Sequence, residues 1–436
     1  MSQDQKPADY QDLSTAAIEM GEAAQQAPAW NRTDTAWTVS LFGTAVGAGV
    51  LFLPIKAGAG GVWPLLAATV LIWPMIFLAH RGLSRMVSSS PQASADITQV
   101  AQDFFGPGFG RVFTFLYFLS IYPVLLIYGV SITNTFDSLL TNQLGLAPLP
   151  RWLLAAILVA AMSAVMLTGQ KIMLAVTQAL VYPLILILFA LTLYLIPHWS
   201  FEGFGQLPSA GDFTVSLWLM LPVLVFAFYH APAISQFSVN MRQQYGPFAS
   251  VKSSQVLRAT SLILTIFIMG FVWSCVLAIG PDGLAEARAS NLPILSYLAN
   301  EFDAPFISWL GPLVAITAIV SSYFGHWLGA HEGAVGIVRE NLDPARQHIS
   351  DSVLKKAVGF FLMVTVWLAA VLNPSILGLI ESLVGPIMAL VLFILPMWAI
   401  RRVPALAPYR GRLSNVFVVV AGLAAFSAVV YGLLPH

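Results

Sequence analysis

Charge is the property that this sequence lacks most. Only 9% of its 436 residues are Asp, Glu, Lys or Arg, whereas a soluble domain carries roughly 25%. The formal net charge is zero, so no excess of basic residues points to nucleic acid as a partner. Apolar residues make up 58% of the chain. The composition therefore excludes an ordinary soluble domain and predicts an all-α polytopic membrane protein in contact with lipid.

Cysteine is almost absent as well. The one cysteine, Cys275, lies in an apolar run, so it forms no internal disulfide and we expect a small buried hydrophobe. Residues 1–30 are polar and hold no apolar core of a signal peptide. We interpret residues 1–33 as a mobile cytoplasmic tail and residues 34–436 as a single transmembrane domain. Metalloprotease, P-loop and Gly-x-Ser-x-Gly motifs are missing, and no reactive constellation supports the alternative of a membrane-embedded enzyme.

Apolar runs long enough to cross a bilayer, which takes ~20 residues, define eleven predicted spans. We place them at about 36–57, 61–86, 110–140, 152–168, 172–196, 215–239, 254–279, 305–338, 356–372, 376–400 and 414–434. Lys and Arg are enriched in cytoplasmic loops. With the N-terminus inside, seventeen of the twenty basic residues lie on the inner side, and three lie outside: Lys56, Arg151 and Arg288. This predicts a cytoplasmic N-terminus and a C-terminus on the opposite side.

The first span contains an unusual glycine-rich stretch, Gly43–Gly49 (GTAVGAG). Each glycine weakens a helix by ~1 kcal/mol relative to alanine. In hydrocarbon, backbone without hydrogen bonds persists only around a cavity or a ligand. We therefore predict a discontinuous helix whose amides and carbonyls bind a small solute. The alternative is a close contact between helices through small residues.

The sixth span is interrupted too, because Pro222, His230 and Pro232 fall within one crossing. Pro232 removes a backbone donor and disfavours helix at Ala231. Interrupted spans five apart are typical of an inverted five-plus-five repeat, in which the substrate binds at mid-membrane between the two breaks. We assign repeat one to 36–196, repeat two to 215–400, and an extra helix to 414–434.

Two stretches between spans predict amphipathic helices, over 96–105 on the inner side and over 291–302 on the outer side. The second is a candidate lid over the outer mouth, and the alternative is an inert interfacial segment. His80 and Arg81 end the second span, and we expect both to extend to the membrane surface.

Several motifs, in the same order along the chain, resemble those of bacterial serine/threonine permeases. They are TAWTVSLFGTAVGAGVLFLPIKAGAGG (35–61), FYHAPAI (228–234), NLPILSYLAN (291–300), FGHWLGA (324–330) and LNPSILG (372–378). These permeases belong to the hydroxy and aromatic amino acid permease family, within the amino acid–polyamine–organocation superfamily. The resemblance implies a LeuT-type fold, the bacterial inner membrane with a periplasmic C-terminus, and cation-coupled uptake of a small amino acid.

A zwitterionic amino acid needs donors for its carboxylate and acceptors for its ammonium. The start of the outer half of span one offers the amides of Gly47, Ala48 and Gly49. Carbonyls of the two breaks can hold the ammonium, at Thr44, Ala45, Phe226, Phe228 and Tyr229. Candidate partners for a substrate hydroxyl are Thr44, Ser120, Tyr122, Tyr229 and His230.

The resemblance also implies a site for the coupling ion, sodium or proton, and no cofactor. A sodium site would use the carbonyls of Gly43, Val46 and Ala318 with the hydroxyls of Ser321 and Ser322. Proton-coupled members carry a lysine where this chain has Ser321. The alternative is that the two serines only allow tight packing. Ionisable candidates for gating or proton transfer are His326, His331, Glu332 and Glu381.

These observations predict a symporter that imports L-serine, with L-threonine as an alternative substrate. An aromatic amino acid permease of the same family is the next reading, although small residues at Ala45 and Ala48 disfavour a bulky substrate. A passive channel would need a continuous polar pore, and only isolated polar groups occur in the spans. The sequence leaves monomer and homo-oligomer equally open.

Overall fold

The computed structural model describes residues 27–92, 94–167, 170–289, 294–301, 305–343, 348–374 and 384–432. These residues form helices and no strand. The helices are α2 (Arg32–Ala45), α3 (Ala48–Gly58), α4 (Val62–Ser88), α5 (Ile97–Ser138), α6 (Arg151–Leu167), α7 (Gln170–Leu195), α8 (Ala210–Ala227), α9 (Ala231–Tyr245), α10 (Ala249–Leu264), α11 (Gly270–Ala289), α12 (Ile294–Glu301), α13 (Pro305–Leu342), α14 (Asp351–Leu372), α16 (Gly385–Ala389), α17 (Leu395–Arg402) and α18 (Leu413–Gly432).

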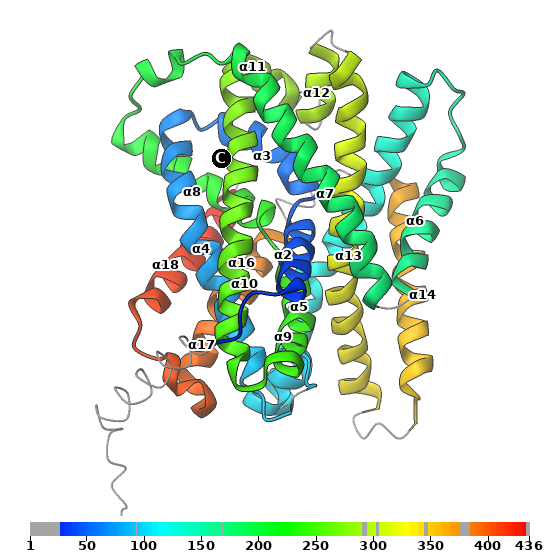
Figure 1. The fold of residues 1–436 in the computed structure, drawn as a ribbon, viewed down its shortest axis with the longest axis vertical. Coiled ribbons are helices and arrows are strands. Elements are labelled where there is room, and N and C mark those ends of the chain that lie inside the picture. The colour runs from blue at the N-terminus through cyan, green and yellow to red at the C-terminus, as the bar shows by residue number, and fades with distance from the viewer. Residues whose placement is uncertain are drawn as a thin grey trace, which may run out of the picture.

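Short π-helical segments continue three of these helices, at Leu139–Gln143, Thr265–Met269 and Leu390–Ile394. Short 3₁₀ turns lie at Ile196–His198, Glu202–Gly205, Gly246–Phe248 and Pro404–Tyr409. Most of the long helices run along the long axis of the molecule, with α2 and α3 near its middle (Figure 1). Helices α6 and α14 lie together at one side and α18 lies at the other.

Among the described residues, eight helical stretches are long and apolar enough to cross a membrane, or nine if the bent pair α2 and α3 is one span. The predicted helix over 96–105 is present, because Asp96 caps the start of α5 and Gly106 turns the chain with φ of 78° before Pro107. Of the predicted lid, the structure describes α12, and residues 290–293 and 302–304 lie outside the described part.

Both predicted interruptions are present. Helix α2 ends at Ala45 and α3 starts at Ala48, with a bend of 58° between them. Helix α8 ends at Ala227 and α9 starts at Ala231. The two breaks lie side by side, because a Cβ on Gly49 would lie 2.8 Å from Cα of Ala227. Glycine at this position therefore lets the two broken helices meet.

Helix α13 packs closely against α5 and forms much of the interior. Glycines spaced four apart on α13 permit this approach: a Cβ on Gly329 would lie 2.7 Å from Ile121, and one on Gly333 would lie 3.0 Å from Phe118. Glycine faces of this kind are common between helices in membranes. They place one face of α13 directly against α5 and beside the broken helices.

Candidate functional site

The break between α2 and α3 exposes backbone groups inside the protein. Val46 is extended, with ψ of 95°, and Gly47 precedes the first turn of α3. Among the described residues, no side chain caps this helix start, so the first-turn amides at Gly47, Ala48 and Gly49 remain available to an anionic group. The partial positive charge of a helix N-terminus favours a carboxylate there. The backbone geometry thus provides what the predicted substrate-carboxylate site requires.

The break between α8 and α9 presents carbonyls on the other side. The amide of Tyr229 donates to the carbonyl of Phe226 at 3.2 Å, and Nδ1 of His230 lies 2.9 Å from the carbonyl oxygen of Phe228. Each of these carbonyls has a second lone pair. Phe226, Phe228, Tyr229 and His230 are all buried. The predicted acceptors for an ammonium group therefore lie in the protein interior.

Two adjacent serines of α13 contact the first break. The hydroxyl of Ser322 donates to the carbonyl of Thr44 at 2.6 Å and lies 2.7 Å from the Tyr128 hydroxyl. The hydroxyl of Ser321 lies 3.3 Å from the carbonyl oxygen of Gly43 and 3.1 Å from that of Ala318. Both serines are fully buried. Three atoms of the predicted sodium site, on Gly43, Ala318 and Ser321, thus come together.

Other polar side chains surround the same region. The ring of His326 packs edge-on against Tyr128, with ring centroids 5.0 Å apart, and its Nδ1 is 2.9 Å from the Ser322 carbonyl oxygen. Ser120 lies 3.0 Å from the Tyr229 hydroxyl, which ties the second break to α5. His326, a predicted gating or proton candidate, therefore lies next to the predicted ion site.

His80 is buried, contrary to the expectation that it extends to the membrane surface. Its ring stacks on His230, with centroids 3.5 Å apart and planes 5° apart. Its Nδ1 lies 2.9 Å from the Ile76 carbonyl, so that nitrogen carries the proton. Its Nε2 then accepts the His230 amide at 3.2 Å. His80 thus binds the amide of the residue that precedes α9. In the sequence, a histidine within a span that has few polar residues could have indicated this interior position.

Some predicted residues lie elsewhere. Tyr122 stacks on Phe118 and on Phe361 of α14, away from the breaks, and Tyr128 of the same helix contacts Ser322 instead. Thr44 already donates its hydroxyl to the Ser40 carbonyl. Among the described residues, no hydrogen bond joins Val46 to either serine; the carbonyl that Ser322 bonds is that of Thr44.

The other ionisable candidates have different hydrogen-bond partners. His331 is half-buried and lies 2.9 Å from the Lys355 carbonyl oxygen, toward α14. Glu332 is buried and accepts from the Gln236 amide at 2.9 Å. Neither His331 nor Glu332 forms an ion pair with Arg339 among the described residues, because Arg339 pairs with Asp343 and with Asp351. Glu381 lies outside the described residues.

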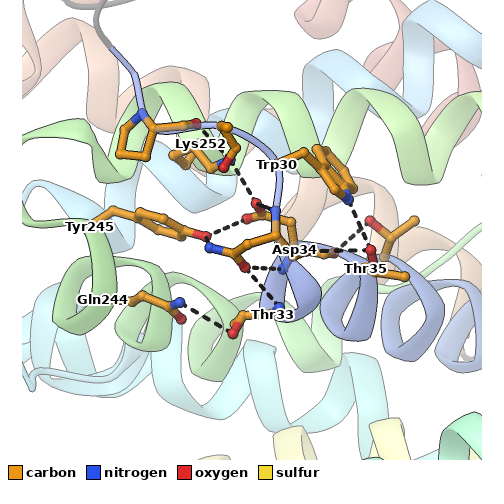
Figure 2. Close-up of polar contacts among 11 residues, drawn as sticks. Trp30, Thr33, Asp34, Thr35, Gln244, Tyr245 and Lys252 are labelled. Atoms are coloured by element: carbon orange, nitrogen blue, oxygen red, sulfur yellow. Dashed lines mark hydrogen bonds and ion pairs between the residues drawn. The ribbon is translucent and has the colours of Figure 1, made fainter.

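A buried ion pair at the start of α2 was not predicted. Lys252 of α10 lies 2.7 Å from Asp34, and both side chains are 0% exposed. Tyr245 of α9 donates to the other carboxylate oxygen of Asp34 at 2.8 Å (Figure 2). Lys252 also donates to the carbonyls of Pro28 and Ala29. Pro28, Ala29 and Asn31 of the predicted tail are therefore hydrogen-bonded to α9 and α10. Charged residues in a chain with little charge could have indicated this pair from the sequence.

Two curated transporters are similar to this chain over most of its length. The serine transporter SdaC of Escherichia coli K12 is 46% identical over 411 residues, covering 93% of this chain and 96% of that protein. The threonine/serine transporter TdcC of Yersinia enterocolitica is 40% identical over 427 residues, covering 93% and 97%.

The solved structure of Mhp1, a nucleobase-cation-symport-1 family transporter with bromovinylhydantoin bound, has a similar fold. The TM-score is 0.55 at 13% identity, and the match covers 91% of this chain and 92% of that one. Residues 34–424 match the tryptophan/tyrosine permease family. The chain is therefore a multi-span membrane transporter rather than an enzyme, and it belongs to the tryptophan/tyrosine permease family.

Proposed function

We propose that this protein imports L-serine, with L-threonine as a second substrate, in symport with a cation. The observation that carries the proposal is the meeting of the two broken helices at Gly49 and Ala227, beside Ser322 and His326 of α13. An amino acid bound there would place its carboxylate on the α3 amides and its ammonium on carbonyls of the second break. Relatives with the names serine transporter and threonine/serine transporter favour a small hydroxy amino acid over an aromatic one.

For the coupling ion we propose sodium, bound by the carbonyls of Gly43, Val46 and Ala318 and the hydroxyls of Ser321 and Ser322. Neutral oxygen ligands suit a hard cation. Contacts among Gly43, Ala318 and Ser321 support this set. Proton coupling is the second candidate, and it is favoured by the buried position of His326 beside Tyr128.

For the membrane arrangement we propose eleven spans in a five-plus-five inverted repeat with an extra C-terminal helix, in a bacterial inner membrane, with the N-terminus inside. Helix α6 supports a span beyond the candidate spans, because it is apolar and only slightly too short to count among them. The tenth predicted span lies partly outside the described residues, which begin again at Val384. Alternating access would rock the broken helices and their partners against α5 and α13.

The test is uptake of radiolabelled L-serine into proteoliposomes. One set carries an inward sodium gradient at equal pH, and the other carries a pH gradient without sodium. We expect accumulation with sodium alone, and competition by unlabelled L-threonine but not by L-tryptophan. Accumulation with the pH gradient alone would assign the proton. If L-serine does not accumulate under either gradient, the substrate proposal fails.

A further inference from the structure

A polar pocket of about 200 Å³ lies between α5 and the C-terminal end of α13. Its charged and amide side chains are those of Asp96, Gln99, Gln102, Arg111, Arg339 and Glu340. Four of its ten lining residues are charged, in a chain that has only 9% charged residues. A water molecule takes about 30 Å³ of the liquid, so this pocket has room for a small polar solute.

The pocket is separate from the transport site. On α13, Glu340 lies roughly 27 Å from Ser322 along the helix axis, at ~1.5 Å per residue. The proposed orientation, which rests on the Lys and Arg distribution, puts this end of α13 on the cytoplasmic side. A ligand of the pocket would therefore come from the cytoplasm.

Glu340 has an unmatched carboxylate oxygen inside the protein. The residue is only 5% exposed. Its Oε1 accepts from the Thr114 hydroxyl at 2.6 Å, and its Oε2 has no hydrogen-bond partner. The neighbouring Arg339 pairs with Asp343 and Asp351 instead. A buried carboxylate oxygen without a donor is costly, and a cationic donor in the pocket would remove that cost.

Arg111 brings the opposite charge to the same pocket. It is exposed, and it forms no ion pair within the part of the chain that the structure describes. Arg111 and Glu340 thus line one pocket without joining each other. A guanidinium binds a carboxylate through two parallel hydrogen bonds. A ligand that carries both an ammonium and a carboxylate therefore matches the two residues.

Other classes of ligand match this lining less well. A simple anion would leave Glu340 without a donor and would meet the negative charge of Asp96. A metal ion would meet two guanidinium groups, and the described residues contain no group of three or more acidic, histidine or cysteine side chains that could hold one. The chemistry of the pocket therefore favours a zwitterion.

We propose that this pocket is a second amino acid site, which binds the zwitterionic group of a free amino acid from the cytoplasm. Oε2 of Glu340 accepts from the ammonium, and the Arg111 guanidinium donates to the carboxylate. Because these contacts read only the groups that all amino acids share, the site accepts L-alanine as well as L-serine. The choice of L-serine as the probe rests on the proposed function.

The experiment measures binding of radiolabelled L-serine to the full chain in detergent by equilibrium dialysis. We expect two components in the wild type, and we expect the dissociation constant of one to rise about tenfold or more in Glu340→Gln, because a bond to a charged group is lost. Arg111→Gln should weaken the same component. Arg111 is exposed, so this variant tests the pocket even if Glu340→Gln does not fold. The matched control is Asp103→Asn, an exposed carboxylate of α5 outside the pocket, which should keep both components.

Competitors test the class of ligand. Ethanolamine has an ammonium without a carboxylate, and lactate has a carboxylate without an ammonium. Neither should displace L-serine from the component that depends on Glu340, whereas L-alanine should. Displacement by ethanolamine alone or by lactate alone would overturn the zwitterion assignment.

The same data separate this proposal from the proposed function. Wild-type binding of L-serine by both Glu340→Gln and Arg111→Gln would overturn the pocket as a site. A single component that depends on Glu340 would support the pocket and count against L-serine as the ligand of the transport site.

Discussion

At the scale of single residues, the candidate site depends on hydroxyl groups that meet exposed backbone. Ser322 bonds the Thr44 carbonyl next to the break, and Tyr128 completes this contact from α5. Glycine is needed at the same place for room: a Cβ on Gly47 would lie 2.6 Å from Oγ of Ser322 and 2.7 Å from the Tyr128 hydroxyl. The Ser322 and Tyr128 hydroxyls therefore reach this break because Gly47 has no side chain.

Gly47→Ala should reduce L-serine uptake on the order of tenfold, because the added methyl group enters the space beside Ser322. Overpacking in a dense interior costs roughly 1–3 kcal/mol, and ~1.4 kcal/mol corresponds to a factor of ten. Initial uptake rates in proteoliposomes provide the measurement. Gly205→Ala is the control, because a Cβ there meets open space. Equal uptake by both variants would remove the first break from the site.

The double variant Ser321→Ala and Ser322→Ala should shift the sodium concentration for half-maximal uptake upward by about tenfold or more. The two hydroxyls are proposed ligands, and bonds to a charged group are worth about 1.5–3 kcal/mol each. The sodium dependence of initial L-serine uptake measures this shift. Ser163→Ala is the control, since Ser163 is buried but bonds Tyr323. A double variant with the wild-type sodium response would contradict the proposed ion site.

At the scale of elements, α2 is attached to α9 and α10 more firmly than its short length suggests. Tyr245 and Gln244 of α9 contact Asp34 and Thr33, and Lys252 of α10 pairs with Asp34 (Figure 2). Further along α2, the Trp37 indole donates to Asn240 at 2.8 Å. The N-terminal half of the first span is therefore held to the helix that follows the second break.

Asp34→Asn should destabilise the protein by about 3–5 kcal/mol, because the change leaves the Lys252 ammonium buried without a counter-charge. The free energy of unfolding is measured by denaturant titration of the protein in detergent. The control is Asp212→Asn, an exposed carboxylate near the start of α8. The pair Asp34→Asn with Lys252→Met should recover most of the loss. A wild-type unfolding curve for Asp34→Asn alone would show that the pair contributes little.

At the scale of the whole molecule, the apolar composition covers the outside as well as the core. Large apolar side chains remain widely exposed on the outer helices, as at Leu186 (67%), Phe360 (64%) and Val420 (60%). Surfaces of this kind require lipid around them. The polar groups instead gather along the axis where α2, α9, α5 and α13 meet. This division of surface and interior is what a membrane transporter needs.

The proposed topology predicts opposite labelling at two exposed positions in a Cys275→Ala background. Gln243→Cys, at the end of α9, should react with a membrane-impermeant maleimide only after the cells are opened. Ala147→Cys, between α5 and α6, should react in intact cells. Both residues are exposed, so burial does not explain a failure to react. Labelling of Gln243→Cys in intact cells would reverse the proposed orientation.

Local chemistry in the sequence determined where the helices break. Glycines at 43–49 and Pro232 weaken or forbid helical hydrogen bonds wherever they lie in the fold, so both breaks were predictable. The break residues were predicted for this reason, whereas Ser321 and Ser322 were predicted from the resemblance to the serine/threonine permeases. The family resemblance and the low charge likewise predicted a membrane transporter, as the relatives indicate.

Only the tertiary structure decided which side chains meet at those breaks. Tyr122 and Tyr128 lie on one helix, six residues apart, which turns them about 240° from each other; the packing of α5 against α13 brings Tyr128 to Ser322 and turns Tyr122 toward α14. His80 stacks on His230 across 150 residues of sequence. Asp34 and Lys252 pair across 218 residues of sequence. Such contacts depend on the rotation and depth of each helix, which packing between helices sets and no local pattern records.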